Sequence, residues 1–454
     1  MTHDLTKGSI IKTMIWFSIP YLISVFLQTF YGLADLFIVG QFNKEDVITA
    51  VSMGSQIMHV IVLIIAGLSV GTTVSISRSL GEGNKEKIPV YIGNSTILFV
   101  AVAVILTPLL ILLSDPILTI MQTPIEAYQP SRDYITICFA GLPFVAVYNL
   151  ISSIFRGLGD TKSPMIFVAI SGVVNILLDY IFVGPMGMHA AGAALATVLA
   201  QAMSVVISII FLARNNKELG VRRSSFRFNR ESFSQLLHIG APLAFQEMLV
   251  EISFLFITAI ANSRGVFVAA AVGVTEKSMS FFFLVPIALQ ATIAPMVAQN
   301  AGAGLHERGR KILRYGVIFV VVYGLIIALI TQFTASGMIG MFTSSEEVIV
   351  LGTQYLRVYI FDTAIASIHF CISGYFNAYE KSIYVFIHNI ISTFAVRVPA
   401  AYLASLWFPE TLYQMGLAAP LGSVASVIIC SFMYFKLSKT IKKMENITTL
   451  NCPQ

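Results

Sequence analysis

Twelve long apolar runs, almost without charged residues, limit what this 454-residue chain can fold into. A helix that crosses a bilayer needs about 20 apolar residues, and every run is long enough to supply them. Apolar residues make up 56% of the chain and charged residues 11%, whereas a soluble domain carries about 25% charge. The sequence therefore predicts an all-α polytopic membrane protein. It excludes a soluble enzyme, a disordered chain and a nucleic-acid-binding protein.

The predicted spans can be placed along the chain to within a few residues. They cover residues 15–39, 48–77, 88–114, 133–155, 164–184, 190–213, 236–261, 266–298, 312–340, 349–377, 383–408 and 413–435. No run shows the sustained alternation of apolar and polar residues that a transmembrane β-barrel requires.

The distribution of Lys and Arg predicts the orientation of the chain. Cytoplasmic loops carry an excess of these residues. With the amino terminus inside, 22 of the 28 basic residues fall on inner loops and tails, three fall within predicted spans, and only Lys44, Arg132 and Arg264 fall on outer loops. We expect a multi-pass protein of the cell (inner, cytoplasmic) membrane with both termini in the cytoplasm. The basic residues then lie near anionic lipid, and no nucleic-acid partner is expected.

An internal repeat divides the chain into two halves. Pro20 matches Pro242 at an offset of 222 positions, and Lys162 matches Lys381 at an offset of 219. Each half holds six predicted helices, an even number, so the halves share one orientation and form a parallel repeat. The predicted domains are an amino-terminal six-helix lobe (1–213), a cytoplasmic basic linker (214–235), and a carboxyl-terminal six-helix lobe with a cytoplasmic tail (236–454).

One motif has the form of a hydrolase nucleophile elbow. Gly67-Leu-Ser69-Val-Gly71 fits Gly-x-Ser-x-Gly, but that chemistry requires a strand–turn–helix context. Here the motif lies inside a predicted membrane helix, where Gly67 and Gly71 also form the GxxxG pattern of close helix packing. We therefore favour packing. The four cysteines lack zinc-site or disulfide-framework spacing, and we expect no cofactor.

Acidic residues inside the first-half spans are the best candidates for function. Asp35 shares a helix face with Gln28 and Tyr31, and Asp179 follows Asn175 by one turn. A buried carboxyl can hold a proton because burial disfavours its charged form. Its oxygens, with an amide oxygen nearby, could instead hold a small hard cation such as sodium. The alternative is a pair of structural hydrogen bonds between helices.

The second half has its own ionisable residues within the predicted spans. Glu247 and Glu251 lie one turn apart near the middle of a span, so we expect one to be protonated or to face a cavity that receives a cation. A structural role for the pair is equally compatible with the sequence. Asp362 is a third carboxylate. The remaining ones fit internal ion pairs or side chains that reach the interface: Glu276, Lys277, Arg357 and Arg397.

Several motifs together resemble those of a known family. They are Pro20, Tyr31-Gly-Leu-Ala-Asp35-Leu-Phe-Ile-Val-Gly40, Ser77-Arg-Ser-Leu-Gly81-Glu-Gly83, Arg156-Gly-Leu-Gly159-Asp-Thr-Lys162, Asn175-Ile-Leu-Leu-Asp179 and Ala191-Gly192-Ala-Ala-Leu-Ala-Thr197. From end to end the chain resembles the multidrug and toxic compound extrusion (MATE) transporters, most closely their DinF-like or MepA-like prokaryotic branch. The resemblance implies two six-helix bundles.

The resemblance also implies a site for the coupling ion in the first lobe. The proton- or cation-coupling residues would be Asp35, Tyr134, Asn175, Asp179 and Thr197. If the ion is sodium, its ligands would come from Asp35, Asn175, Asp179 and Thr197. Pro20 would allow the first helix to bend. Glu247, Glu251 and Asp362 are similar to second-lobe carboxylates of the NorM-like branch, which leaves open which lobe holds the ion. Gln28 and Tyr31 are candidates for the substrate cavity.

These features predict a secondary active transporter and not an enzyme. We expect a monomeric multidrug antiporter that exports lipophilic, often cationic, organic compounds by alternating access, driven by an inward proton or sodium gradient. One alternative is a flippase for a lipid-linked precursor, for which the implied relatives carry more basic charge in the cavity. A distant alternative is an intramembrane hydrolase, for which only the Gly67–Gly71 motif offers a nucleophile.

Overall fold

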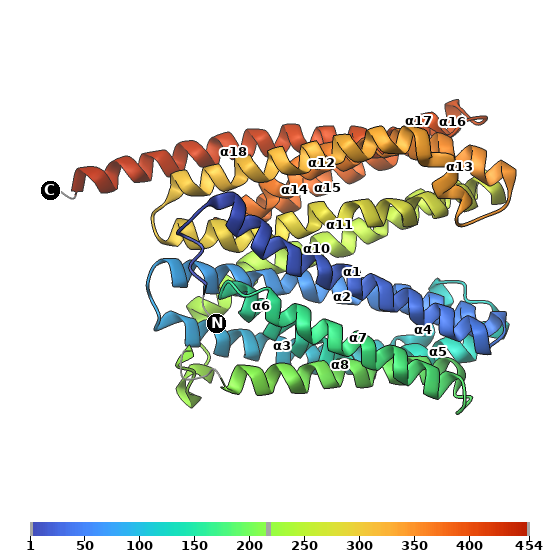
Figure 1. The fold of residues 1–454 in the computed structure, drawn as a ribbon, viewed down its shortest axis with the longest axis horizontal. Helices are drawn as coiled ribbons and strands as arrows, with labels where there is room; N and C mark the ends of the chain where they lie inside the picture. The colour runs from blue at the N-terminus through green and yellow to red at the C-terminus, as the bar shows by residue number, and fades with distance from the viewer. Residues whose placement is uncertain (1–2, 215–218, 452–454) are drawn as a thin grey trace. The chain divides into compact units, whose positions relative to one another are not determined.

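The computed structural model describes residues 3–214 and 219–451, and these residues form helices, turns and loops with no β-strand (Figure 1). Lys217, one of the basic residues of the predicted linker, lies outside the described residues. Contacts divide the chain into two compact units. The first contains Ile15–Ala244 and the described residues up to Leu5, and the second contains Thr6–Met14 and the residues from Phe245 onward.

Among the residues that the structure describes, the first half of the chain forms eight α-helices and a short 3-10 helix. Their bounds are α1 (Ile10–Phe42), α2 (Glu45–Gly81), α3 (Lys87–Leu112), α4 (Ser114–Ile120), α5 (Ile125–Ala140), α6 (Leu142–Gly157), α7 (Lys162–Val183), α8 (His189–Arg214) and η1 (Arg223–Phe226). Within the first unit, α7 packs along α8, and α2 packs against both α5 and α6. The long helices of this unit run roughly side by side (Figure 1).

The second half repeats this plan with one irregular helix. Its elements are α10 (Arg230–Asn262), α11 (Val266–Gly302), α12 (His306–Gly340), α13 (Glu346–Tyr359), α14 (Asp362–Ala378), α15 (Ser382–Ile391), the π-helix η2 (Ser392–Arg397), α16 (Val398–Trp407), α17 (Tyr413–Gly416) and α18 (Ala418–Asn451). Helices α11, α12 and α14 pack on one another, and α14 also packs on α18.

The predicted twelve spans are confirmed when two bent helix pairs are each counted as one span. Among the described residues, ten helical stretches are long and apolar enough to cross a membrane. The other two spans are α5 with α6, bent by 46°, and α13 with α14, bent by 43°. Both pairs fall where the sequence predicts a single span, since hydropathy does not reveal a break between two apolar helices.

The Gly67–Gly71 motif is a helix-packing motif, as its GxxxG spacing predicts. A Cβ added to Gly71 on α2 would lie 2.5 Å from the Leu236 carbonyl oxygen of α10. In return, a Cβ added to Gly240 on α10 would lie 2.5 Å from the Leu68 carbonyl oxygen. The two backbones touch because small residues are present on both sides. Ser69 lies within this helix, and its hydroxyl donates to the Ala66 carbonyl.

The start of α7 is fixed by a buried carboxylate. Asp160 Oδ1 accepts hydrogen bonds from the backbone N–H groups of Lys162 and Ser163, both at 3.0 Å. Its Oδ2 accepts from the Ser163 hydroxyl at 2.6 Å. Helix amino termini leave N–H groups without partners inside the helix, and Asp160 supplies acceptors for two of them. This contact anchors the helix that carries Asn175 and Asp179.

We expect Asp160→Ala to lower the free energy of unfolding by about 1–2 kcal/mol, the usual cost of losing such a cap. Asp160→Asn should lower the free energy of unfolding by less, because its amide oxygen can still accept a hydrogen bond from a backbone N–H group. Asp115→Ala is the control: its carboxylate pairs with Arg132 at 2.8 Å but is exposed, and solvent screens exposed pairs so that they contribute little to stability. Thermal unfolding of the purified protein measures all three. An equal loss for Asp160→Ala and Asp115→Ala would contradict the capping role.

Candidate functional site

Two carboxylates meet in the interior of the first unit. Asp35 lies on α1 and is 5% exposed, and Asp179 lies on α7 and is 0% exposed. Their charges are close enough to interact. No described Lys or Arg forms an ion pair with either of them. Two buried like charges repel, so the pair is stable only with a proton or a cation present.

Helix α5 supplies the next wall of the site. Tyr134 is buried, its hydroxyl lies 3.0 Å from the Ser55 hydroxyl of α2, and it interacts electrostatically with both Asp35 and Asp179. Gly54 makes room for the Tyr134 ring, because a Cβ at that position would overlap the ring. Cys138, one turn after Tyr134, also lies near Asp35.

Asn175 and Thr197 complete the group between α7 and α8. The Asn175 side-chain N–H donates to the Thr197 hydroxyl at 3.4 Å. The structure therefore gathers all five predicted coupling residues in the first unit. Their roles stay predictions. Ser55 and Cys138 also belong to this neighbourhood. Apart from the spacing of Cys138 one turn from Tyr134, no pattern in the sequence distinguishes these two residues.

Several oxygens of this group lack a donor. Asp35 Oδ1, Asn175 Oδ1 and both carboxylate oxygens of Asp179 are buried without a hydrogen-bond partner among the described residues. A buried acceptor without a donor costs about 1–3 kcal/mol. A proton on one carboxyl would supply a donor, and a sodium ion would use the same oxygens as ligands. These atoms are all hard oxygen ligands, and they fit either a proton or a sodium ion.

The other first-helix candidates lie along α1. Pro20 is buried, and α1 continues through it as one helix, in which Ser24 donates to the Pro20 carbonyl at 2.8 Å. The Tyr31 ring lies against Gly172 of α7, whose hypothetical Cβ would meet the ring at 3.2 Å. Gln28 is half-buried one turn before Tyr31. Bending at Pro20 and substrate contact by Gln28 and Tyr31 stay predictions.

The second-unit carboxylates have different surroundings. Glu247 and Glu251 interact with each other along α10, and the Gln246 amide donates to Glu247 at 3.4 Å. Asp362 is the first residue of α14, at the bend of the α13–α14 pair, and it interacts electrostatically with Glu276. Glu276 forms an ion pair with Arg397, whereas Lys277, its neighbour in sequence, is exposed.

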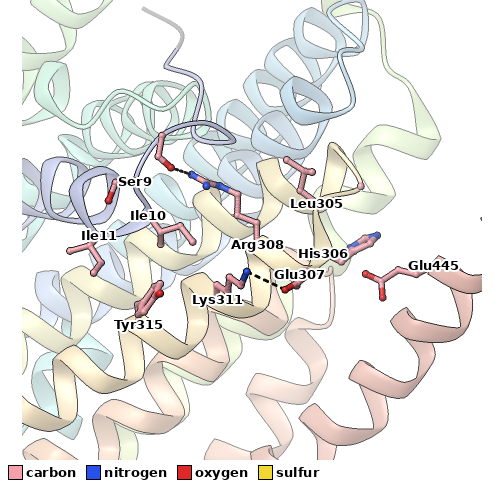
Figure 2. Close-up of a pocket in the computed structure, with 12 residues that line it drawn as sticks. Ser9, Ile10, Ile11, Leu305, His306, Glu307, Arg308, Lys311, Tyr315 and Glu445 are labelled. Atoms are coloured by element: carbon pink, nitrogen blue, oxygen red, sulfur yellow. Dashed lines mark hydrogen bonds and ion pairs between the residues drawn. The ribbon is translucent and has the colours of Figure 1, made fainter. Parts of the chain in front are cut away.

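A surface pocket of 580 Å³ lies in the second unit at the start of α12 (Figure 2). Arg308 points to the segment before α1 and donates to the carbonyl oxygens of Lys7 and Gly8, both at 2.9 Å. Lys311 pairs with Glu307 at 3.1 Å. The pocket contains none of the predicted site residues. Its arginine holds the amino-terminal segment in place.

Twelve apolar spans in two repeated halves, with ionisable groups buried inside them, define a polytopic membrane transporter. A sequence model of the MatE family matches residues 20–181 and 242–403, one match in each half and 222 positions apart. The chain belongs to the MatE family. It is a multi-pass secondary transporter and not an enzyme.

Named relatives match the chain over nearly its whole length. The probable multidrug resistance protein YpnP of Bacillus subtilis is 27% identical, covering 96% of this chain and 97% of its own. The multidrug export protein MepA of Staphylococcus aureus is 24% identical, covering 95% and 96%. A crystal structure of MATE in the bent conformation, 21% identical, has a TM-score of 0.92 over 98% of this chain and 100% of that chain. This last likeness shows the fold.

Proposed function

We propose that this transporter is a multidrug efflux antiporter of the cell membrane. It exports lipophilic and cationic organic compounds in exchange for protons or sodium ions that enter down their gradient. It works as a monomer by alternating access, with both termini in the cytoplasm. The names of YpnP and MepA support this cargo class. The excess of basic residues on one side of the predicted topology supports the orientation.

The Asp35–Asp179 pair carries the proposal. It is buried, has no described cationic partner and holds oxygens that lack donors. Such a pair attracts a cation of either kind, an organic substrate or the coupling ion. When a proton or sodium ion enters, the negative charge falls and a cationic substrate loses its counter-charge. Exchange then follows from the different affinities of the two states for the two ligands.

Asn175 and Thr197 position the ion in this scheme. If the ion is a proton, the Asn175 amide oxygen can accept from the protonated Asp179 one turn later. If the ion is sodium, Asp35, Asn175, Asp179 and Thr197 supply its oxygen ligands. Pro20 has no N–H to donate, so α1 has one fewer helical hydrogen bond there. We propose that α1 bends at this position as the charge of Asp35 changes.

The same electrostatics disfavours the flippase alternative. A lipid-linked phosphate needs basic groups in the cavity, and no described Lys or Arg forms an ion pair with Asp35 or Asp179. The acidic pair favours cationic cargo.

Everted membrane vesicles with one imposed gradient provide the direct test. We expect a fluorescent lipophilic cation to accumulate in the vesicles when the lumen is either acidic or rich in sodium, with only one of the two gradients effective. Vesicles without the transporter are the control. If neither a proton gradient nor a sodium gradient drives uptake, the antiporter proposal is overturned. Movement of a lipid-linked phosphate instead would favour the flippase.

A further inference from the structure

The second unit contains an arginine within its buried acidic cluster. Arg397 ends the π-helix η2, and its guanidinium Nη2 lies 3.8 Å from Glu276 Oε1 on α11. The side chains of Arg397 and Glu276 are 15% and 22% exposed. The guanidinium also stacks over the Phe254 ring of α10, 4.5 Å from its centroid. Arg397 is therefore enclosed by protein on more than one side.

Two tyrosines hold this ion pair in a fixed geometry. The Tyr359 hydroxyl accepts from Arg397 at 3.1 Å and donates to Glu276 Oε2 at 3.0 Å. The Tyr355 hydroxyl donates to Glu276 Oε1 at 3.5 Å. Asp362 on α14 interacts with the charges of both Glu276 and Arg397. The groups that act on Arg397 are thus Glu276, Asp362, Tyr355 and Tyr359.

The internal repeat gives this cluster a counterpart in the first half of the sequence. Tyr134 and Tyr355 are 221 positions apart, and so are their hydrogen-bond partners Ser55 and Glu276. The same tyrosine contact thus recurs in each half, with a hydroxyl partner in one and a carboxylate in the other. In the first half the nearby carboxylates have no described cationic partner, whereas in the second half Arg397 supplies a cation.

We infer that Arg397 is a tethered cation that takes the place of an exchangeable ion in the second-half acidic cluster. A guanidinium stays protonated at every physiological pH and cannot diffuse away. Glu276 is therefore neutralised permanently and offers no exchangeable site to a proton or sodium ion. Resting on the proposed function, this removes Glu276 from the carboxylates that can exchange the coupling ion.

The local helix geometry supports a dedicated role for Arg397. Residues 392–397 form a π-helix, a rare conformation that is frequent at functional sites. Close packing also fixes the arginine stem, because a Cβ at Gly422 of α18 would lie 3.0 Å from the Arg397 Cβ.

The test measures thermal unfolding of the purified protein in sodium chloride and in choline chloride of equal ionic strength. Arg397→Gln should lower Tm by roughly 5–10 °C, because it leaves buried carboxylates without their cation. Sodium, but not choline, should restore at least half of that loss by binding in place of the arginine. Sodium binding at the first-half site would raise Tm equally in all variants. The test therefore compares how much more sodium raises the Tm of Arg397→Gln than that of the wild type.

Three further variants separate this role from simple packing. The double variant Glu276→Gln/Arg397→Gln should show a smaller decrease in Tm than Arg397→Gln alone. It should show no extra sodium response. Arg397→Lys keeps a cation and should respond to sodium as the wild type does. Lys277→Gln, which removes an exposed cation from the same helix as Glu276, should leave Tm and the sodium response unchanged.

Two results would overturn the inference. One is a sodium response of Arg397→Gln equal to that of the wild type, and the other is additive losses in the double variant. If Arg397→Gln cannot be purified, the double variant decides by its yield: near-wild-type yield supports the inference, and an equally poor yield overturns it. Because unfolding is measured without transport, these outcomes do not depend on whether the vesicle experiment succeeds.

Discussion

Asp179→Asn is expected to reduce ion-driven efflux by about 5–150-fold, the range that coupling between two ligands typically covers. The substitution keeps the shape of the side chain but removes the group that gains and loses a charge. Asp35→Asn should have an effect of the same order. The double variant should be little worse than either single variant, since the two carboxyls act as one unit in the proposed exchange. Efflux in everted vesicles and drug resistance of cells measure the effect.

A matched control for these variants is Asp133→Asn. Asp133 is an exposed carboxylate on α5, the helix of Tyr134, and it accepts a hydrogen bond only from Gln129 among the contacts described for its side chain. Its amide variant should transport at the wild-type rate. All variants should be recovered from the membrane at similar levels. Wild-type resistance in cells that express Asp35→Asn would refute the coupling role of the pair.

Gly71→Ala should cause a large loss of stability for the addition of one methyl group. The new Cβ would lie 2.5 Å from the Leu236 carbonyl oxygen, and the contact involves backbone atoms that cannot rotate away. Overpacking a tight contact costs about 1–3 kcal/mol and occasionally more. Gly240→Ala, on the other side of the α2–α10 contact, should have a similar effect. Thermal unfolding and the yield of folded protein are the measurements.

Gly337→Ala provides a control of opposite sign. A Cβ at this exposed position of α12 meets nothing within 4 Å. Replacing glycine by alanine inside a helix without a clash is stabilising by about 0.5–1 kcal/mol. If Gly71→Ala changes the thermal stability in the same direction and by the same amount as Gly337→Ala, the close contact between α2 and α10 is refuted.

The spans could be predicted from the sequence because a bilayer imposes length and polarity at the same time. The bends at Gly141 and near Phe361 could not be predicted. Apolar residues continue across both breaks, and hydropathy does not report a change in the direction of a helix. Gly141 is followed by Leu142 and Pro143. A Cβ at Gly141 would overlap Val198 of α8, so that glycine is also required by packing between distant segments.

Only part of the site could be predicted from the sequence, namely the residues whose charge is unusual inside a membrane span. Asp35 and Asp179 stand out because few charges lie within the spans, and Asn175 follows from its spacing to Asp179. Tyr134 and Thr197 were reached through the family resemblance, because single polar residues are common in membrane helices. Ser55 and Cys138 carried no such signal.

The partner of Glu276 was not predictable from its position in the sequence. Lys277 is adjacent in the chain, but successive residues of a helix point in directions about 100° apart. The actual partner, Arg397, lies on another helix, and the structure alone brings the two together.

The π-helix before Arg397 also bears on how members of such a family could diverge. A π-turn accommodates one residue more than an α-turn, so losing one residue between Ser392 and Arg397 could restore a regular helix without breaking it. Because the extra residue is absorbed within the π-turn, the helix on either side would keep its orientation, and the arginine would still face Glu276. This turn can therefore change in length by one residue while the chain keeps its permanent internal counter-charge.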